Sequence, residues 1–286
     1  MRENMEQHFN TPSEVIDTNM KAGEGKAHLP LGKMILLGIM AGAFIALGGA
    51  TSSTAAHAID NVGLARFVAG IIFPVGLMII VFVGGELFTG NCLIVMDVVG
   101  KKVTWFECIR NLIVVYFSNL IGALIIDTLI YFSGNLDYTG GLLGAYAIKV
   151  AVGKVGISPL KGITSGILCN ILVCIAILMA VAATDFVGKV WAIFFPIMAF
   201  VVGGFEHCVA NMYYIPAGLM AASNSKYVDK ACELYGYTAQ QISDQLTVGH
   251  FFSKNLLPVT LGNIIGGGLI VGIGLYIINK PKKVEE

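Results

Sequence analysis

Two glutamates with matching surroundings are the residues of this sequence whose type and spacing first suggest chemistry. Glu86 is followed five residues later by Asn91, and Glu206 is followed five residues later by Asn211. The two glutamates are 120 residues apart, and each lies just after a Gly-Gly pair within a long apolar stretch. This recurrence predicts an internal repeat, although a match this short also arises by coincidence.

An ionisable side chain inside an apolar stretch is costly in lipid, so Glu86 and Glu206 should face protein or water. Gly-Gly pairs supply the backbone freedom that an interrupted helix needs. Backbone that leaves the helix at membrane depth must be covered by protein or must line a cavity. The favoured interpretation is that each carboxylate is structural and accepts backbone N–H groups freed at a helix break, together with Asn91 and Asn211. The alternative is a proton relay.

Each predicted break also creates the N-terminus of a new half-helix, which presents unpaired N–H groups and a partial positive charge. Such an end is a natural anion site. Thr89 lies at the first break, where its hydroxyl could cap the following half-helix, line a pore, or do both.

His207 lies beside Glu206 in the second break. A lone histidine is more often a satisfied core residue than a functional one, but its place at a break favours a functional role. Imidazole can donate a hydrogen bond to an anion or pass it a proton, because histidine titrates near neutral pH. Since a buried unpaired anion is expensive, His207 would lower the barrier to anion passage.

Bulky apolar residues surround the two breaks. They could be ordinary core residues or constrictions that exclude hydrated ions: Phe73, Leu77, Leu87, Phe88, Val173 and Phe200. Lys26 and Lys154 could gather anions at the two mouths of a pore, or could simply be solvated loop charges.

These residues need a membrane scaffold, because crossing the hydrocarbon takes about 20 apolar residues as a helix. Two of the apolar stretches are too long for one plain crossing and contain the breaks. The predicted spans are 34–58, 64–98, 106–133, 159–183, 190–222 and 254–278. The polar segment 224–253 is expected to form an exposed loop. The fold class is thus an all-α membrane protein of six transmembrane helices, two of them broken.

Three spans in each half would make the two halves inverted repeats, an arrangement that places the permeation site near the bilayer midplane. With both termini inside, 11 lysines and arginines lie on the inner side and seven on the outer side, which favours cytoplasmic termini. The expected organisation is a cytoplasmic segment 1–33, a channel domain 34–278 and a cytoplasmic tail 279–286, in a plasma (inner) membrane.

Composition excludes several classes of protein. The 286 residues are 56% hydrophobic and 13% charged, against about 25% charged residues in soluble domains. A net charge of zero gives no reason to expect a nucleic-acid partner. None of the six cysteines forms a CxxC pair, no HExxH motif is present, and the polar N-terminal residues do not resemble a signal peptide. We therefore expect no enzyme activity, no metal and no cofactor.

With these residues in view, the sequence closely resembles the formate/nitrite transporter family. The stretches that carry the resemblance are Gly23-Glu24-Gly25-Lys26-Ala27, Gly85-Glu86-Leu87-Phe88-Thr89, residues 169–174 (Cys-Asn-Ile-Leu-Val-Cys), residues 204–212 around His207, and residues 255–268 in the last span.

The resemblance implies an aquaporin-like fold in a symmetric homopentamer, with one pore per subunit. It places Thr89 and His207 at the pore centre, supported by Asn170 and Asn263. It also implies that the bulky apolar residues form constrictions and that Lys26 and Lys154 lie in the vestibules. Family substrates are small weak-acid anions such as formate, nitrite and hydrosulfide.

Two departures from formate channels bear on the substrate. Residues 47–54 read Leu-Gly-Gly-Ala-Thr-Ser-Ser-Thr where those channels carry bulky aromatic residues, and Gly90-Asn91 stands where they often have two serine-like residues. A nitrite or hydrosulfide channel therefore fits at least as well as a formate channel. The alternative from another class is a neutral-solute channel of aquaporin type, although the Asn-Pro-Ala signatures of those proteins are absent.

Overall fold

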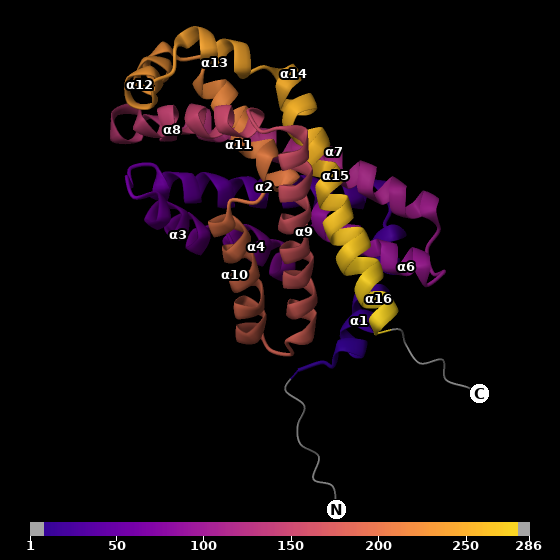
Figure 1. Ribbon diagram of the computed structural model, residues 1–286. Helices are drawn as coiled ribbons and strands as arrows, with labels where there is room; N and C mark the ends of the chain where they lie inside the picture. Colours follow the sequence, from indigo (N-terminus) through magenta and orange to yellow (C-terminus); the bar gives the residue numbers. More distant parts are fainter. Residues whose placement is uncertain (1–8, 280–286) are drawn as a thin grey trace, which may run out of the picture.

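The computed structural model describes residues 9–279, and in this part of the chain the regular structure is helical (Figure 1). Six helical stretches of the described residues are long and apolar enough to cross a membrane. They are Leu31–Ala56 (α2), Val62–Val83 (α3 and α4), Trp105–Phe132 (α7), Pro159–Ala182 (α9), Phe186–Gly203 (α10) and Val248–Ile278 (α14 to α16).

Both predicted breaks are present. After α3 (Val62–Ile72) and α4 (Val75–Val83) the chain leaves the helix at Gly84, whose φ of 105° suits glycine. It becomes helical again in α5 (Phe88–Asn91), η1 (Cys92–Ile94) and α6 (Val95–Val99). In the second half α10 ends at Gly203, with Gly204 in the left-handed region, and α11 (Cys208–Ala221) follows.

The last span is helical throughout but contains two π-helical stretches. Its parts are α14 (Val248–His250), η3 (Phe251–Leu256), α15 (Leu257–Ile264), η4 (Ile265–Ile273) and α16 (Gly274–Ile278). Gly262 and Gly266 lie against the carbonyl oxygens of Ile163 and Ile167 in α9, and a Cβ at either glycine would come within 2.2 Å of that oxygen. Glycine therefore allows the last span to pack closely on α9.

The N-terminal part of the described chain forms α1 (Pro12–Ala27), whose N-terminus is closed by a 2.7 Å hydrogen bond from the Thr11 N–H to Glu14. In Figure 1, α1 and α16 lie at the same end of the molecule. Of the predicted tail 279–286, only Asn279 lies within the described residues, and residues 1–8 of the predicted N-terminal segment lie outside them.

The opposite end contains helices that the hydropathy pattern did not predict. Segment 224–253, expected to be a loop, forms α12 (Ser225–Tyr235), α13 (Ala239–Gln245) and the start of the last span. Residues 134–158, left without a span, form η2 (Asn135–Asp137) and α8 (Tyr138–Val155). Hydropathy identifies helices that cross lipid, whereas these lie across one end of the helical bundle (Figure 1).

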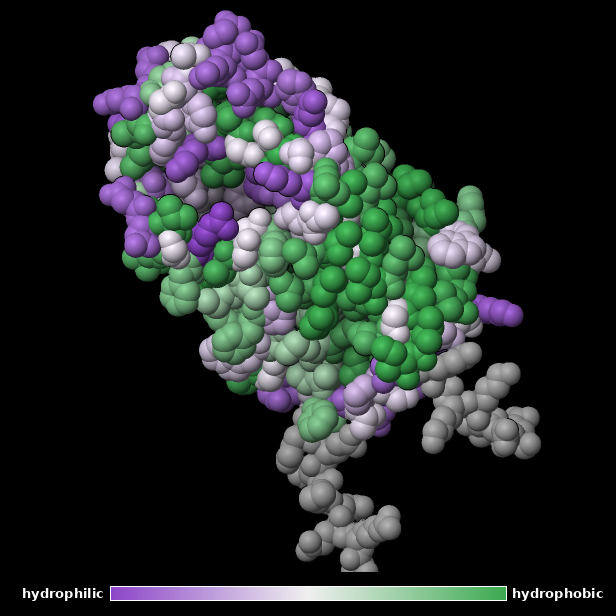
Figure 2. All heavy atoms as spheres, viewed as in Figure 1, coloured by the Kyte–Doolittle hydropathy of each residue, from purple (hydrophilic) through white to green (hydrophobic). Residues whose placement is uncertain are grey.

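The surface agrees with a membrane location. Figure 2 shows hydrophobic side chains covering the middle of the visible face, over α9 and α15. Hydrophilic side chains gather around α12 and α13 and near α1, at the two ends. This division is expected of a protein whose middle lies in lipid.

Candidate functional site

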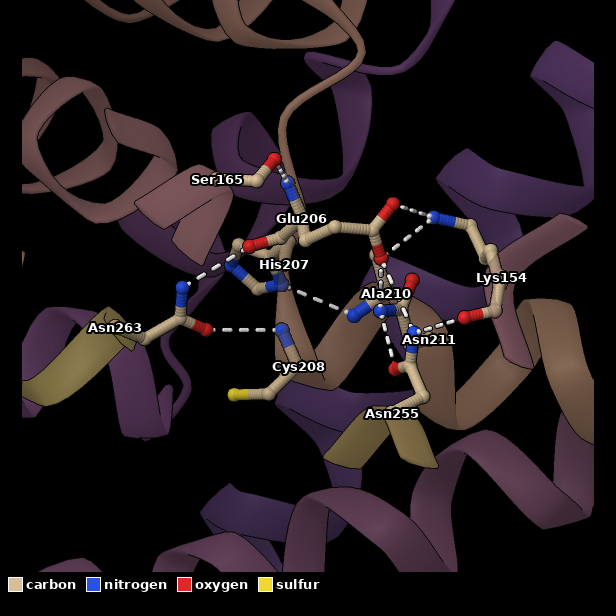
Figure 3. A network of polar contacts seen from close by, with 9 residues as sticks. All are labelled: Lys154, Ser165, Glu206, His207, Cys208, Ala210, Asn211, Asn255 and Asn263. Carbon is tan, nitrogen blue, oxygen red and sulfur yellow. Dashed lines mark hydrogen bonds and ion pairs between the residues drawn. The ribbon is translucent and has the colours of Figure 1, made fainter. Parts of the chain in front are cut away.

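Glu206 lies at the centre of a polar network around the second break (Figure 3). Its carboxylate accepts two hydrogen bonds from Lys154 Nζ, at 3.0 and 3.1 Å, and one of 2.6 Å from Asn211 Nδ2. Asn211 Nδ2 also donates to Asn255 Oδ1 at 2.7 Å, and Asn255 Nδ2 donates to the Lys154 carbonyl at 2.8 Å. Four side chains from α8, the break, α11 and the last span thus hold one another in place.

The first break contains the same network, built from equivalent residues. Lys26 Nζ lies 3.2 Å from the carboxylate of Glu86, which accepts a 2.6 Å hydrogen bond from Asn91 Nδ2. Asn91 Nδ2 also donates to Asn111 Oδ1 at 2.8 Å, and Asn111 Nδ2 donates to the Lys26 carbonyl at 3.0 Å. Because every member has a counterpart, the repeat predicted from a few residues extends through both halves.

The predicted hydrogen-bond donors of the two glutamates, backbone N–H groups, were wrong. Both carboxylates are buried and structural in their contacts, but they accept from lysine and asparagine side chains instead of backbone N–H groups. Lys26 and Lys154, expected at the mouths, each lie beside a carboxylate that balances their charge. Asn91 and Asn211 link that ion pair to a neighbouring span.

The backbone groups freed at the breaks are satisfied by two further asparagines. Asn263 Oδ1 accepts from the Cys208 N–H at 2.9 Å, and its Nδ2 donates to the carbonyls of Glu206 and Gly166. Asn119 accepts from the Phe88 N–H at 3.0 Å and donates to the carbonyls of Glu86 and Gly38. The first amide of each half-helix is therefore already bonded, so a visiting anion must contact other donors.

The two half-helices meet at Thr89 and His207, the residues that the family resemblance predicts for the pore centre. Thr89 Oγ1 lies 3.0 Å from His207 Nε2, and both residues are buried. Thr89 is the second residue of α5 and its hydroxyl does not cap that helix, which corrects the capping interpretation. Instead His207 is itself the N-cap of α11, where its Nδ1 accepts a 3.0 Å hydrogen bond from the Ala210 N–H.

These contacts assign the tautomer of His207. Because Nδ1 accepts the Ala210 N–H, the ring proton of neutral imidazole lies on Nε2 and is donated to Thr89 Oγ1. The Thr89 hydroxyl proton is then available to a third group. Protonation of Nδ1 would remove the cap of α11, so the geometry favours a neutral histidine that keeps Thr89 oriented as a donor.

A cavity of about 920 Å³ extends from the α12 end of the molecule to His207, and its lining includes Phe73 and Phe200. The rings of Phe73 and Phe200 meet edge to face with centroids 5.5 Å apart, and Phe200 stacks on the imidazole with centroids 5.8 Å apart. The two phenylalanines thus lie together beside the histidine, and their role as a constriction stays a prediction.

The other predicted constriction residues are distributed differently. Phe88 packs against Tyr116 with ring centroids 4.9 Å apart and lines an apolar groove between α7 and the last span, not the cavity that contains His207. Leu77, Leu87 and Val173 are buried in the main core. Asn170 supports the centre indirectly, since its Nδ2 donates to the carbonyls of Thr89 and Asn263 at 3.2 and 2.7 Å.

Three structural asparagines were missed by the sequence analysis as site residues: Asn111, Asn119 and Asn255. A signal for them was present, because Asn111 and Asn119 are eight residues apart in one apolar span, and Asn255 and Asn263 are eight residues apart in another. Buried polar residues repeated at equal spacing in equivalent spans indicate a shared network.

Comparison with known proteins agrees with this geometry. Residues 13–277 match the family model described as formate/nitrite transporter. The chain is 37% identical to the formate channel FocA of Haemophilus influenzae, over 92% of each chain, and 35% identical to FocA of Escherichia coli strain K12, over 93% of each. A solved structure described as a pentameric formate channel with formate bound superposes with a TM-score of 0.79 at 34% identity, covering 87% of this chain and 97% of that one.

A second solved structure, described as an ion channel of the same family, superposes with a TM-score of 0.76 at 28% identity, covering 93% of this chain and 99% of that one. The matches extend over nearly the whole described chain, including both breaks and all six spans. This multi-pass membrane protein belongs to the formate/nitrite transporter family.

Proposed function

We propose that this protein is a channel for small monovalent weak-acid anions and that formate is its main substrate. The observation that carries the proposal is the Thr89–His207 pair at the meeting point of two half-helices, where His207 lines the same cavity as Phe73 and Phe200. With His207 as its donor partner, Thr89 offers a hydroxyl proton to an anion that has passed the phenylalanines.

A weak-acid anion suits this arrangement better than a permanent one. Apolar rings strip water from an ion, and burial of an unpaired charge is expensive. Formate, nitrite or hydrosulfide can escape this penalty by taking up a proton, whereas chloride cannot. His207 is linked to this proton uptake through its hydrogen bond to Thr89. The proton that the anion takes up is supplied by the solvent.

The two departures from formate channels are explained by packing, so they do not argue against formate as the substrate. Gly48 lies against the carbonyl of Phe73, and Gly49 lies against the ring of Tyr213, where a Cβ would come within 2.7 Å. Asn91 belongs to the Glu86 network. Since these residues serve the scaffold and the relatives compared above are named as formate channels, formate is favoured over nitrite and hydrosulfide.

The proposal includes assembly as a pentamer and cytoplasmic termini. Support for the pentamer comes from the relative described as pentameric, and support for the orientation comes from the excess of lysine and arginine on the α1 side. Cross-linking of the purified protein would reveal five copies, and a protease added to right-side-out vesicles would leave tags at both termini intact.

The test is a substrate panel in proteoliposomes, with stopped-flow uptake of formate, nitrite, hydrosulfide, chloride and glycerol at two pH values. We expect formate flux to exceed chloride flux and to rise as external pH falls. Chloride flux equal to that of the weak acids at each pH would overturn the anion mechanism, and glycerol flux above formate flux would favour a neutral-solute channel.

A further inference from the structure

The cavity that leads to His207 contains three cationic side chains that the pore network does not use. They are Arg66 of α3, Lys149 of α8 and Lys230 of α12. Among the described residues, no carboxylate lies within ion-pair distance of any of the three. This separates them from Lys154, whose charge is balanced by Glu206 at 3.0 Å.

Each of the three is held over the cavity by a contact that leaves its charge in place. Arg66 Nη1 donates to the Val202 carbonyl at 3.3 Å, and Lys230 Nζ donates to the Gly140 carbonyl at 3.3 Å. Lys149 Nζ lies 4.5 Å from the centroid of the Tyr235 ring. A carbonyl or an aromatic face orients an ammonium or guanidinium group without neutralising it.

The charges of the whole cavity favour an anion. Four cationic side chains line it (Arg66, Lys149, Lys154 and Lys230), against two carboxylates (Asp60 and Glu206). Glu206 is already committed to Lys154, so Asp60 is the carboxylate that opposes the other three. Low-dielectric walls focus such a field and raise the local concentration of the opposite charge.

Lys230 reaches the cavity on a segment that only the second half possesses. The residue offset between the halves is 120 for Asn91 and Asn211 but 144 for Asn111 and Asn255, so the second half contains 24 additional residues between these positions. The extra length corresponds to the region of α12 and α13, which lies beside α8 over the end of the bundle (Figure 1). Figure 2 shows a hollow bordered by hydrophilic side chains at this end.

We propose that Arg66, Lys149 and Lys230 form an anion-capture site at the α12 end of the cavity, distinct from the Lys154–Glu206 pair. The site concentrates small monovalent anions before they reach Phe73 and Phe200, and it sets the apparent affinity of the channel more than its maximal flux. This inference rests on the proposed anion-channel function and specifies how that channel acquires its substrate.

The test neutralises two of the cations, because Arg66 also contacts the backbone near the break. K149Q/K230Q should raise the formate concentration for half-maximal uptake about threefold or more per charge at an ionic strength of about 10 mM. At about 500 mM the difference should nearly vanish, because salt screens the field. Maximal flux should stay at the parent level.

Lys226 provides the matched control. It lies one turn from Lys230 on α12, but its Nζ is 2.6 Å from Asp137 and it does not line the cavity. K226Q removes the same charge from the same helix and should leave half-maximal uptake unchanged. An equal shift in K226Q, or no shift in K149Q/K230Q at low salt, would overturn the capture site.

A second readout does not depend on transport. Chloride should enter the cavity even if it does not pass the phenylalanines, so the NMR linewidth of chloride should broaden with the parent protein and broaden less with K149Q/K230Q. Loss of this difference contradicts the capture site. Normal chloride broadening in a protein that transports no formate would instead contradict the proposed function alone.

Discussion

The two halves of this protein share one scaffold but not one chemistry. Asn91 and Asn119 of the first half correspond to Asn211 and Asn263 of the second, with the same hydrogen bonds. The Glu86 N–H donates to the Leu37 carbonyl at 3.1 Å, and the equivalent Glu206 N–H donates to the Ser165 hydroxyl at 3.1 Å. At the break itself the halves differ, since the N-cap is Leu87 in one and His207 in the other. Likewise Thr89 corresponds to Val209, 120 residues later.

This difference separates what holds the breaks from what acts at them. The duplicated residues satisfy the freed backbone and the buried charges, so they are required twice. Thr89 comes from one half and His207 from the other, and only together do they make the 3.0 Å contact at the centre. Because each residue of the pair comes from a different half, the two inverted halves together form one polar pair where they meet, instead of one pair in each half.

The largest expected effect follows from removal of a glutamate. Glu206→Ala leaves the ammonium of Lys154 without its carboxylate acceptor and removes one of the two acceptors of Asn211 Nδ2 and of Asn255 Nδ2. Breaking a buried ion pair costs about 3 kcal/mol or more. We expect a severe loss of folded oligomer in gel filtration and a lower melting temperature.

Glu86→Ala should be milder, because the Lys26 side chain is 35% exposed whereas that of Lys154 is 17% exposed. Water can therefore solvate Lys26 after its partner is lost. If the two variants lost equal stability, exposure of the lysine would not be the distinguishing factor. A fully stable Glu206→Ala oligomer would contradict the structural role.

The two capping asparagines should behave alike. Asn119→Ala and Asn263→Ala each remove three hydrogen bonds at a break and leave an amide and carbonyls unsatisfied, at a cost of about 1–3 kcal/mol for a buried group. Thermal unfolding of both variants in detergent measures this. If only one of the two variants lost stability, the two breaks would not depend equally on their asparagines, although their hydrogen bonds are the same.

Thr89→Val tests the asymmetric pair with little change in shape. It removes the hydroxyl that His207 orients, so we expect formate flux to fall about tenfold, the equivalent of one hydrogen bond, with assembly unchanged. Thr89→Ser restores a hydroxyl and should restore flux. Val209→Thr at the equivalent position of the second half is the control, and it should not raise flux.

The smallest expected effect lies in the segment that only the second half contains. Hydrogen bonds from Lys226 and Tyr227 hold the pKa of Asp137 below its usual value. Because the folded pKa is the lower one, the stabilisation is present above the ordinary value near 4 and is lost as pH falls through the folded pKa. Asp137→Asn should therefore increase hydrogen exchange of α12 at neutral pH, and the difference from the parent should disappear as pH falls below the folded pKa of Asp137, with formate flux unchanged at neutral pH.

The sequence predicted the six spans and the two helix breaks well for a physical reason. Apolar length, Gly-Gly breaks and ionisable residues inside spans are properties of single segments, so Glu86, Glu206 and His207 stood out. The partners of these residues come from other segments, and no local pattern pairs Lys154 with Glu206 or turns Phe88 towards Tyr116. Hydropathy did not predict helices such as α8 and α12, because these helices do not cross lipid.

The central claim is that His207 and Thr89 together govern anion passage. His207→Asn tests it most directly, because asparagine is also a good N-cap and can keep the Ala210 N–H bonded while it removes the Nε2 contact with Thr89. We predict that, in proteoliposomes that contain normally assembled variant, the formate flux of the variant differs at least about tenfold from that of the parent within the range pH 5 to 8. Formate flux identical to that of the parent across this range would contradict the account.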